Sequence, residues 1–236
     1  MLNSLEERKI VVTGAAGVLG AAVVQALVRR GARVAAIDLA VFHQPANQSI
    51  AQYPGVDLND SESVISVLRQ ASQWLSGKPL GGIDSLVNVA GGFAWENLEG
   101  GVLTTWDRLY TANLRSAVVA SQAAVTHLLE KGTGSVVNVG AWAAVQADAG
   151  MGAYAASKSG VMRLTEAMAQ EFKNREITVN AVLPSIIDTP ANREAMPEAD
   201  VSRWVSPDAV ARVIAFLVSD DARAITGASI PVIGRM

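Results

Sequence analysis

Short runs rich in valine and isoleucine alternate along the chain with segments that have the periodicity of helices. The runs that we interpret as buried strands are Lys9–Thr13, Arg33–Ile37, Ser85–Val89, Ser135–Val139 and Thr178–Leu183. Strands that are apolar at nearly every position are typical of a sheet covered on both faces. Because strands and helices follow each other without a break, neighbouring strands pair in parallel through right-handed crossovers. The sequence therefore predicts an α/β fold with a doubly wound parallel sheet.

The chain has a suitable length for one α/β domain and shows no linker or short repeat. Half of its 236 residues are apolar and only 17% are charged, which suits a buried sheet and an extensive subunit interface. We therefore predict a single domain over residues 1–236. Residues 184–206 are the one long stretch without a clear strand or core-helix pattern, at the end of a strand. We interpret them as a substrate lid.

Charge and composition narrow the classes of partner. The net charge of -3 and the pI of about 5.4 provide no basic field for nucleic acid. The absence of cysteine excludes disulfide and thiolate chemistry. The N-terminal MLNSLEERK lacks the apolar core of a signal peptide, and no long apolar stretch is free of glycine, polar or charged residues. We expect a soluble cytoplasmic protein with a small-molecule substrate and without nucleic acid, membrane or metal partners.

A glycine-rich turn directly follows the first predicted strand. Gly14, Gly17 and Gly20 stand between this strand and a helical segment. Asp38 comes at the end of the next strand. Glycines at this place let the backbone turn tightly and approach a pyrophosphate, and an acid beyond the second strand accepts a hydrogen bond from a ribose hydroxyl. The turn predicts a dinucleotide site, and the alternative is a purely structural connection.

Asp38 also indicates which dinucleotide binds. A 2′-phosphate would place about two negative charges against its carboxylate. No arginine or lysine stands at positions 15–18 or 39–40 to compensate. We therefore predict a preference for NAD(H) over NADP(H).

Tyr154 and Lys158 are four residues apart, and in a helix they share one face. A phenol with a pKa of about 10 exchanges protons poorly at neutral pH. A neighbouring ammonium and an oxidised nicotinamide both favour the phenolate, so we expect the pKa of Tyr154 to be lowered. The pair predicts an acid–base site, and the alternative is an ordinary pair on a helix surface.

Several motifs, in this order along the chain, resemble those of the short-chain dehydrogenase/reductase family. They are Thr13–Gly20, Asn88–Gly91, Asn113, Tyr154-x-x-x-Lys158 and Val179–Pro184. Together they span nearly the whole chain. The resemblance implies a single Rossmann-type domain with seven parallel strands in three α/β/α layers, a nicotinamide cofactor, and a catalytic set of Asn, Ser, Tyr and Lys.

The resemblance also implies a role for individual residues. Tyr154 would exchange the proton, Lys158 would bind the nicotinamide ribose, and Asn113 would hold a water between Lys158 and solvent. Asp57 would contact the adenine and Thr189 the carboxamide. Asn113 could instead cap a helix kink, and Asp57 could simply end a strand. The implied cofactor site comprises Gly14, Ala16, Gly17, Leu19, Gly20, Asp38, Asp57, Leu58, Asn88, Ala90, Gly91, Val139, Tyr154, Lys158, Pro184 and Thr189.

The serine of the family's catalytic set is missing. Its position, thirteen residues before Tyr154, holds Ala141. Losing one donor to a developing oxyanion costs about 3 kcal/mol, or roughly 10²- to 10³-fold in rate. A simple ketone would therefore react slowly. A conjugated ring that is already polarised could still accept hydride with a proton from Tyr154.

Several local strings resemble the dihydropteridine reductase branch of the family, which also lacks the serine. They are Val89–Ala94, Gly140–Ala144, Gly150–Met151 and parts of Leu183–Trp204. This likeness implies an NADH-dependent reductase that acts on a conjugated ring such as a dihydropterin. Trp95 and Trp142 follow predicted strands and could stack on such a ring. They could equally pack within the protein or against another subunit.

Two other functions remain open at this point. The first is a dehydrogenase or reductase of alcohols or 3-oxoacyl groups, in which Ser185 or Gln146 replaces the missing hydroxyl. The second is a catalytically silent, nucleotide-binding regulatory protein. An intact set of Tyr154, Lys158 and Asn113 argues against the second, because a protein that only binds needs no proton relay.

Two long segments, Thr105–Glu130 and Tyr154–Phe172, carry more apolar surface than one sheet face can cover. In the family that the chain resembles, such helices pair across a two-fold axis. We therefore expect a homodimer or a homotetramer.

Overall fold

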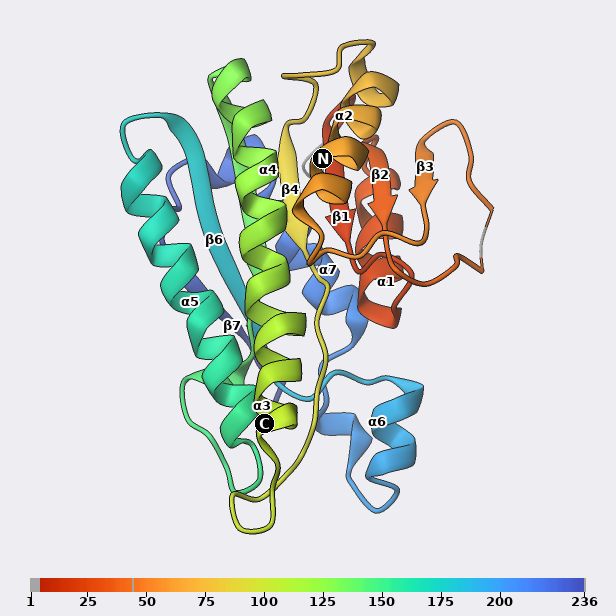
Figure 1. Cartoon of the computed structure of the whole chain (residues 1–236). Helices are drawn as coiled ribbons and strands as arrows, with labels where there is room; N and C mark the ends of the chain where they lie inside the picture. The colour runs from red at the N-terminus through yellow and green to blue at the C-terminus, as the bar shows by residue number, and fades with distance from the viewer. Residues whose placement is uncertain (1–4, 44, 236) are drawn as a thin grey trace.

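The computed structural model describes residues 5–43 and 45–235. Its centre is one seven-stranded sheet in the order β3-β2-β1-β4-β5-β6-β7, with every neighbouring pair parallel (Figure 1). The strands are β1 (Lys9–Thr13), β2 (Arg33–Ile37), β3 (Ile50–Tyr53), β4 (Ser85–Asn88), β5 (Thr133–Val139), β6 (Glu176–Pro184) and β7 (Ser229–Val232). This topology confirms the predicted doubly wound, Rossmann-type sheet.

Helices cover both faces of the sheet. One apolar core joins the sheet to α1 (Val18–Val28) and α7 (Pro207–Leu217). The other joins the opposite face to α2 (Ser61–Ser76), α4 (Ser116–Lys131) and α5 (Gly152–Phe172) (Figure 1). The two cores confirm the predicted three-layer arrangement.

Local sequence signals explain where two of these helices begin. The Asp60 side chain accepts hydrogen bonds from the backbone of Glu62 and Ser63 and so caps α2. Ser206 caps α7, and Pro207 occupies the first turn of that helix. Caps of this kind depend only on residues within one helical turn.

Most of the remaining short elements lie near the carboxyl ends of the strands, whereas Asp220–Ala222 lies near their amino ends, where Asp220 pairs with Arg8. Helix α3 (Leu103–Leu109) continues through a π-helical turn (Tyr110–Arg115) into α4. Helix α6 (Pro190–Ala195) lies at the lower end of the view in Figure 1, as does α3. Short 3₁₀ turns occupy Trp142–Ala144, Val201–Arg203 and Asp220–Ala222. Within residues 5–43 and 45–235, no helix combines the length and the hydropathy that crossing a membrane requires.

Candidate active site

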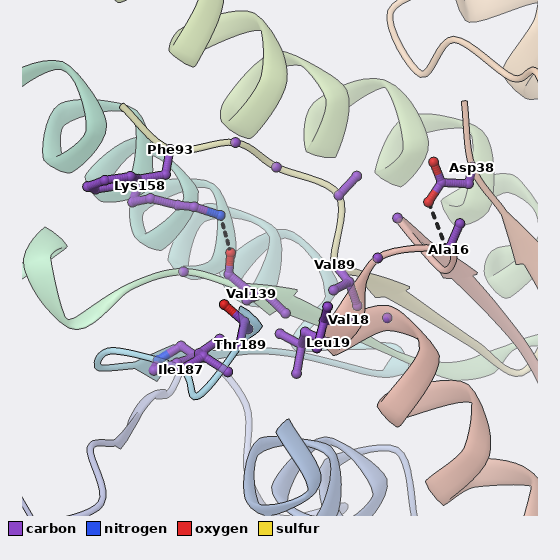
Figure 2. Close-up of a pocket in the computed structure, with 18 of the residues that line it drawn as sticks. Ala16, Val18, Leu19, Asp38, Val89, Phe93, Val139, Lys158, Ile187 and Thr189 are labelled. Atoms are coloured by element: carbon purple, nitrogen blue, oxygen red, sulfur yellow. Dashed lines mark hydrogen bonds between the residues drawn. The ribbon is translucent and has the colours of Figure 1, made fainter. Parts of the chain in front are cut away.

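A cavity of about 580 Å³ opens where β1, β4, β5 and β6 end. Ligands commonly bind in this crevice of doubly wound sheets. Figure 2 shows Asp38 and Ala16 at one end and Lys158 and Phe93 at the other. The predicted residues that line the cavity are Gly14, Ala16, Gly17, Leu19, Gly20, Asp38, Ala90, Gly91, Val139, Tyr154, Lys158, Pro184 and Thr189.

The glycine-rich turn contains two positions that exclude a side chain. Gly14 has φ of 64°, and a Cβ there would lie 2.5 Å from the backbone nitrogen of Ala90. A Cβ at Gly20 would clash with the carbonyl oxygen of Gly14 and would lie 2.7 Å from the Cα of Ala15. Gly17 instead precedes the first residue of α1, so it opens the helix N-terminus to the cavity. An anion is favoured at such a helix end.

Asp38 is held by the backbone on both sides of its carboxylate. The Ala16 N–H donates to Oδ2 at 2.9 Å, and the Ala40 N–H donates to Oδ1 at 2.9 Å. The first bond, drawn in Figure 2, ties the glycine-rich turn to the end of β2. Each carboxylate oxygen has a second lone pair, so Asp38 can still accept from a hydroxyl in the cavity.

Lys158 is buried at the opposite end of the cavity. Its Nζ donates to the backbone carbonyl of Val139 at 2.8 Å (Figure 2). Burial lowers the pKa of Lys158 to about 8, because the charged form loses its hydration. A buried amine beside an open cavity can donate to ligand hydroxyls as well as to Val139.

Tyr154 lies one helical turn before Lys158 and lines the same cavity. Burial raises the pKa of Tyr154 to about 12, because loss of water around the phenol disfavours the phenolate. The sequence had led us to expect a lowered pKa, from the neighbouring ammonium and an oxidised nicotinamide together. At neutral pH the group is therefore a phenol that carries its proton.

Asn113 lies in the π-helical turn and is buried. Its Oδ1 accepts from the Gly92 N–H at 2.8 Å, and its Nδ2 donates to the Gly92 carbonyl at 3.1 Å and to Ser157 Oγ at 2.9 Å. A Cβ at Gly91 would lie 2.6 Å from Asn113 Oδ1 and 3.1 Å from Lys158 Nζ. Only a glycine at position 91 therefore leaves room for the side chains of Asn113 and Lys158 beside the backbone there.

Three residues that the resemblance assigned to the cofactor do not line the cavity. Asn88 is buried, and its Nδ2 donates to Ser121 Oγ at 3.0 Å and to Asn138 Oδ1 at 2.9 Å. Leu58 is buried in the apolar core under α2. Asp57 is exposed and accepts from the backbone N–H of Asn59. Asn113 lies outside the lining too, behind Gly91 and Gly92.

Ala141 is buried directly after β5, where the family carries its serine. Of the two suggested replacements, Ser185 lines the cavity, but its hydroxyl donates to the Ile233 carbonyl at 3.0 Å. Gln146 is exposed and does not belong to the described lining. Neither side chain therefore points a free donor at the position that the serine would occupy.

Several lining residues were not assigned to the site from the sequence. They are Val18, Ala40, Val89, Gly92, Phe93, Gly140 and Ile187. Phe93 matters most, since its ring meets the Tyr154 ring edge to face, with centroids 4.9 Å apart and planes at 79°. The only signal in the sequence was its place directly after the two glycines that follow β4.

The cavity fits a nicotinamide dinucleotide. The turn that excludes side chains at Gly14 and Gly20 offers backbone and a helix N-terminus to a pyrophosphate. Asp38 offers a carboxylate to a ribose at one end. Lys158 and Tyr154 lie at the other end, beside Thr189, whose Oγ1 accepts from Asn192 N–H and caps α6 without using its own proton.

Comparison with known proteins agrees with this site. The model of the short chain dehydrogenase family matches residues 8–200. The chain is 29% identical to 2-(S)-hydroxypropyl-CoM dehydrogenase 3 of Xanthobacter autotrophicus, over 100% of the chain and 99% of that protein. It is 33% identical to D-threitol dehydrogenase of Mycolicibacterium smegmatis, over 98% of the chain and 93% of that protein. It is also 33% identical to the 3-oxoacyl-(acyl-carrier-protein) reductase of Pseudomonas aeruginosa, over 99% of the chain and 98% of that protein.

The fold is also similar to that of a solved structure. A short-chain type dehydrogenase/reductase from Mycobacterium ulcerans superposes with a TM-score of 0.87, over 98% of this chain and 90% of that one, at 23% identity. The matched family model spans the glycine-rich turn, the Tyr154–Lys158 pair and most of the sheet. The chain therefore belongs to the short-chain dehydrogenase/reductase family of NAD(P)-dependent oxidoreductases.

Proposed function

We propose that this protein is an NAD(H)-dependent reductase in which Tyr154 supplies the proton and no serine assists it. The observation that carries this proposal is one cavity that holds Asp38 and the glycine-rich turn at one end and Tyr154 and Lys158 at the other. The serine position, Ala141, has no hydroxyl to add.

Each side chain of the site has a separate task in this proposal. Asp38 and Lys158 hold the two riboses. Asn113 fixes the backbone of Gly92 relative to Ser157 on α5 through its three hydrogen bonds. Bound nicotinamide would supply the hydride. Tyr154 gives its proton to the substrate atom that becomes basic. Because burial raises its pKa to about 12, Tyr154 holds that proton at neutral pH and can donate it.

Asp38 supports the preference for NAD(H). Both of its oxygens are fixed by backbone N–H groups, so the carboxylate cannot easily turn away from a 2′-phosphate. Lys158 is the only lysine or arginine among the described lining residues, and it lies at the other end of the cavity. Dissociation constants for NADH and NADPH test the preference, and tighter binding of NADPH would overturn it.

The proposed substrate is a flat, conjugated acceptor of the dihydropterin type, because such a ring needs less polarisation than a simple ketone. The second candidate is a reaction of alcohols or 3-oxoacyl groups, which the names of the relatives in Mycolicibacterium smegmatis and Pseudomonas aeruginosa favour. NADH oxidation with quinonoid dihydropterin, ketones and 3-oxoacyl thioesters decides between them. Cofactor binding without turnover of any compound would favour a regulatory, nucleotide-binding protein.

Restoring the hydroxyl sharpens this test. In Ala141→Ser, ketone reduction should rise by roughly 10²-fold, while turnover of a conjugated ring should change little. Ala141→Cys is the matched control, because it adds a side-chain atom of similar position with a weak donor. A similar gain on both substrate classes would contradict the conjugated-ring proposal.

We also propose that the protein self-associates as a dimer or tetramer and that it works in the cytoplasm. The family commonly forms oligomers and acts on small molecules. Cell fractionation tests the cytoplasmic location.

A further inference from the structure

The loop between β4 and α3 carries an aromatic side chain into the cavity. Phe93 lines the cavity and contacts Tyr154 edge to face. It nevertheless remains 53% exposed, so a large part of the ring is free to meet a ligand. The ring thus contacts the proposed proton donor and is still partly exposed.

Trp95 does not belong to the described lining, although it stands only two residues further along. Its indole instead covers Gly150, which lies between β5 and α5. A Cβ at Gly150 would clash with the indole and would lie 2.7 Å from its Cδ2. Next to this contact, the Glu96 N–H donates to the Gly150 carbonyl at 2.8 Å. The two loops are therefore joined by one packing contact and one hydrogen bond.

Glu96 continues the connection toward α3. Its Oε1 accepts from the Val102 N–H at 2.8 Å, and its Oε2 accepts from Thr105 Oγ1 at 2.8 Å. At the other end of the loop, Asn113 holds the backbone of Gly92 through two hydrogen bonds. Phe93 is therefore fixed between two anchors rather than on a free loop.

Phe93 lies at the same end of the cavity as Lys158 (Figure 2), and Tyr154, which also lines the cavity, packs against its ring. The lining of the cavity also includes the apolar side chains of Val139 and Ile187. Flat rings gain from stacking or edge contacts with a fixed aromatic side chain, whereas flexible aliphatic chains gain only from burial.

We propose that Phe93 selects flat substrates at this site and that Trp95, packed on Gly150, holds Phe93 in position. This inference rests on the proposed reductase function, since it describes the substrate side of the same cavity. Phe93 touches the substrate in this proposal, and Trp95 and Gly150 are positioning residues.

The test compares phenylpropanedione with nonanedione, two diketones with equal numbers of carbon and oxygen atoms. In Phe93→Leu, kcat/KM for phenylpropanedione should fall about threefold to tenfold relative to nonanedione, mainly through KM. Phe93→Tyr keeps the ring and should keep the preference. Equal losses on both diketones in Phe93→Leu, or loss of the preference in Phe93→Tyr, would overturn the role of Phe93.

Gly150→Ala tests the positioning contact. It should reduce the same preference and speed hydrogen exchange at the Glu96 amide, because the new methyl group displaces the indole. The matched control is Gly100→Ala in the loop that carries Phe93, since Gly100 has φ of 78° against 76° for Gly150, and a Cβ there meets nothing within 4 Å. If Gly150→Ala and Gly100→Ala behaved alike, Trp95 would not be the residue that positions Phe93.

A binding experiment separates this inference from the proposed function. Titration of the NAD⁺-saturated protein with the two diketones needs no turnover. If neither diketone were reduced, tighter binding of phenylpropanedione that is lost in Phe93→Leu would still support the role of Phe93. Equal binding of both diketones by the unmodified protein would overturn the inference even if the reductase activity were present.

Discussion

The pKa values of two side chains in the cavity are shifted by the loss of water around them. Lys158 keeps one hydrogen bond, to Val139, in exchange for its hydration, and its pKa falls to about 8. Tyr154 loses water as well, and its pKa rises to about 12. Both shifts have the same cause, since burial disfavours the charged form of each group. The site is organised to bind polar ligand groups rather than to stabilise the fold.

The proton donor gives the first prediction. Tyr154→Phe removes the only acidic hydrogen of that ring and should lower kcat roughly 10²- to 10⁴-fold. NADH binding should change by no more than about twofold, because the aromatic ring stays. Tyr110→Phe is the control, since Tyr110 is exposed and lies in the π-helical turn, outside the described lining. Unchanged turnover in Tyr154→Phe would contradict the proposed reaction.

Lys158 gives a prediction about stability. Its folded pKa, about 8, lies below the ordinary value of 10.5, so the folded state is penalised while the amine is charged. This penalty is complete below pH 8 and disappears as the pH rises toward 10.5. Lys158→Met should therefore stabilise the protein without cofactor at pH 7 by roughly 1–3 kcal/mol and have little effect near pH 10. Urea unfolding at both pH values measures the difference, and a destabilised variant at pH 7 would contradict it.

At the scale of elements, the pattern of apolar residues located the central strands and missed the two edges. Strands β3 and β7 have four residues each and are mostly half-buried. An edge strand covered on fewer sides needs no continuous apolar run, so periodicity gives it no clear signal. The total of seven strands was implied only by the family resemblance. Helix α2 differs from these strands, because its cap and its apolar stripe are both local features of the sequence.

Polar side chains also connect the elements beneath the cavity. Asn88 on β4 bonds Ser121 on α4 and Asn138 on β5, and Asn138 donates to Thr165 on α5 at 2.9 Å. All four side chains are buried. The network fixes the ends of β4 and β5 relative to α4 and to α5, the helix that carries the proposed catalytic pair.

Asn88→Ala tests whether this residue is structural. It leaves Ser121 and Asn138 short of a partner, so the free energy of unfolding should fall by about 1–3 kcal/mol. NADH affinity should stay within about twofold. Asp60→Ala, which removes the cap of α2, is a control that should cost about 1 kcal/mol in a segment away from the described lining. A large loss of NADH affinity with unchanged stability would instead support a cofactor contact.

At the scale of the whole molecule, apolar side chains remain on the surface around α3. Leu103, Trp106 and Tyr110 are exposed on this helix and the turn that follows it. Apolar surface of this kind is commonly covered by another subunit. Sedimentation at micromolar concentration should therefore give the mass of a dimer or tetramer. A monomer under these conditions would contradict the expected oligomer.

The sequence alone determined the alternation of strands and helices, the glycine-rich turn with Asp38, and the spacing of Tyr154 and Lys158. These features are local, because they depend on neighbouring residues or on one helical turn. Only the tertiary structure decided that Asn88 is buried, that Phe93 rather than Trp95 lines the cavity, and that the pKa of Tyr154 rises. Each of these depends on contacts between distant segments and on the water that packing excludes, and neither quantity is a property of local sequence.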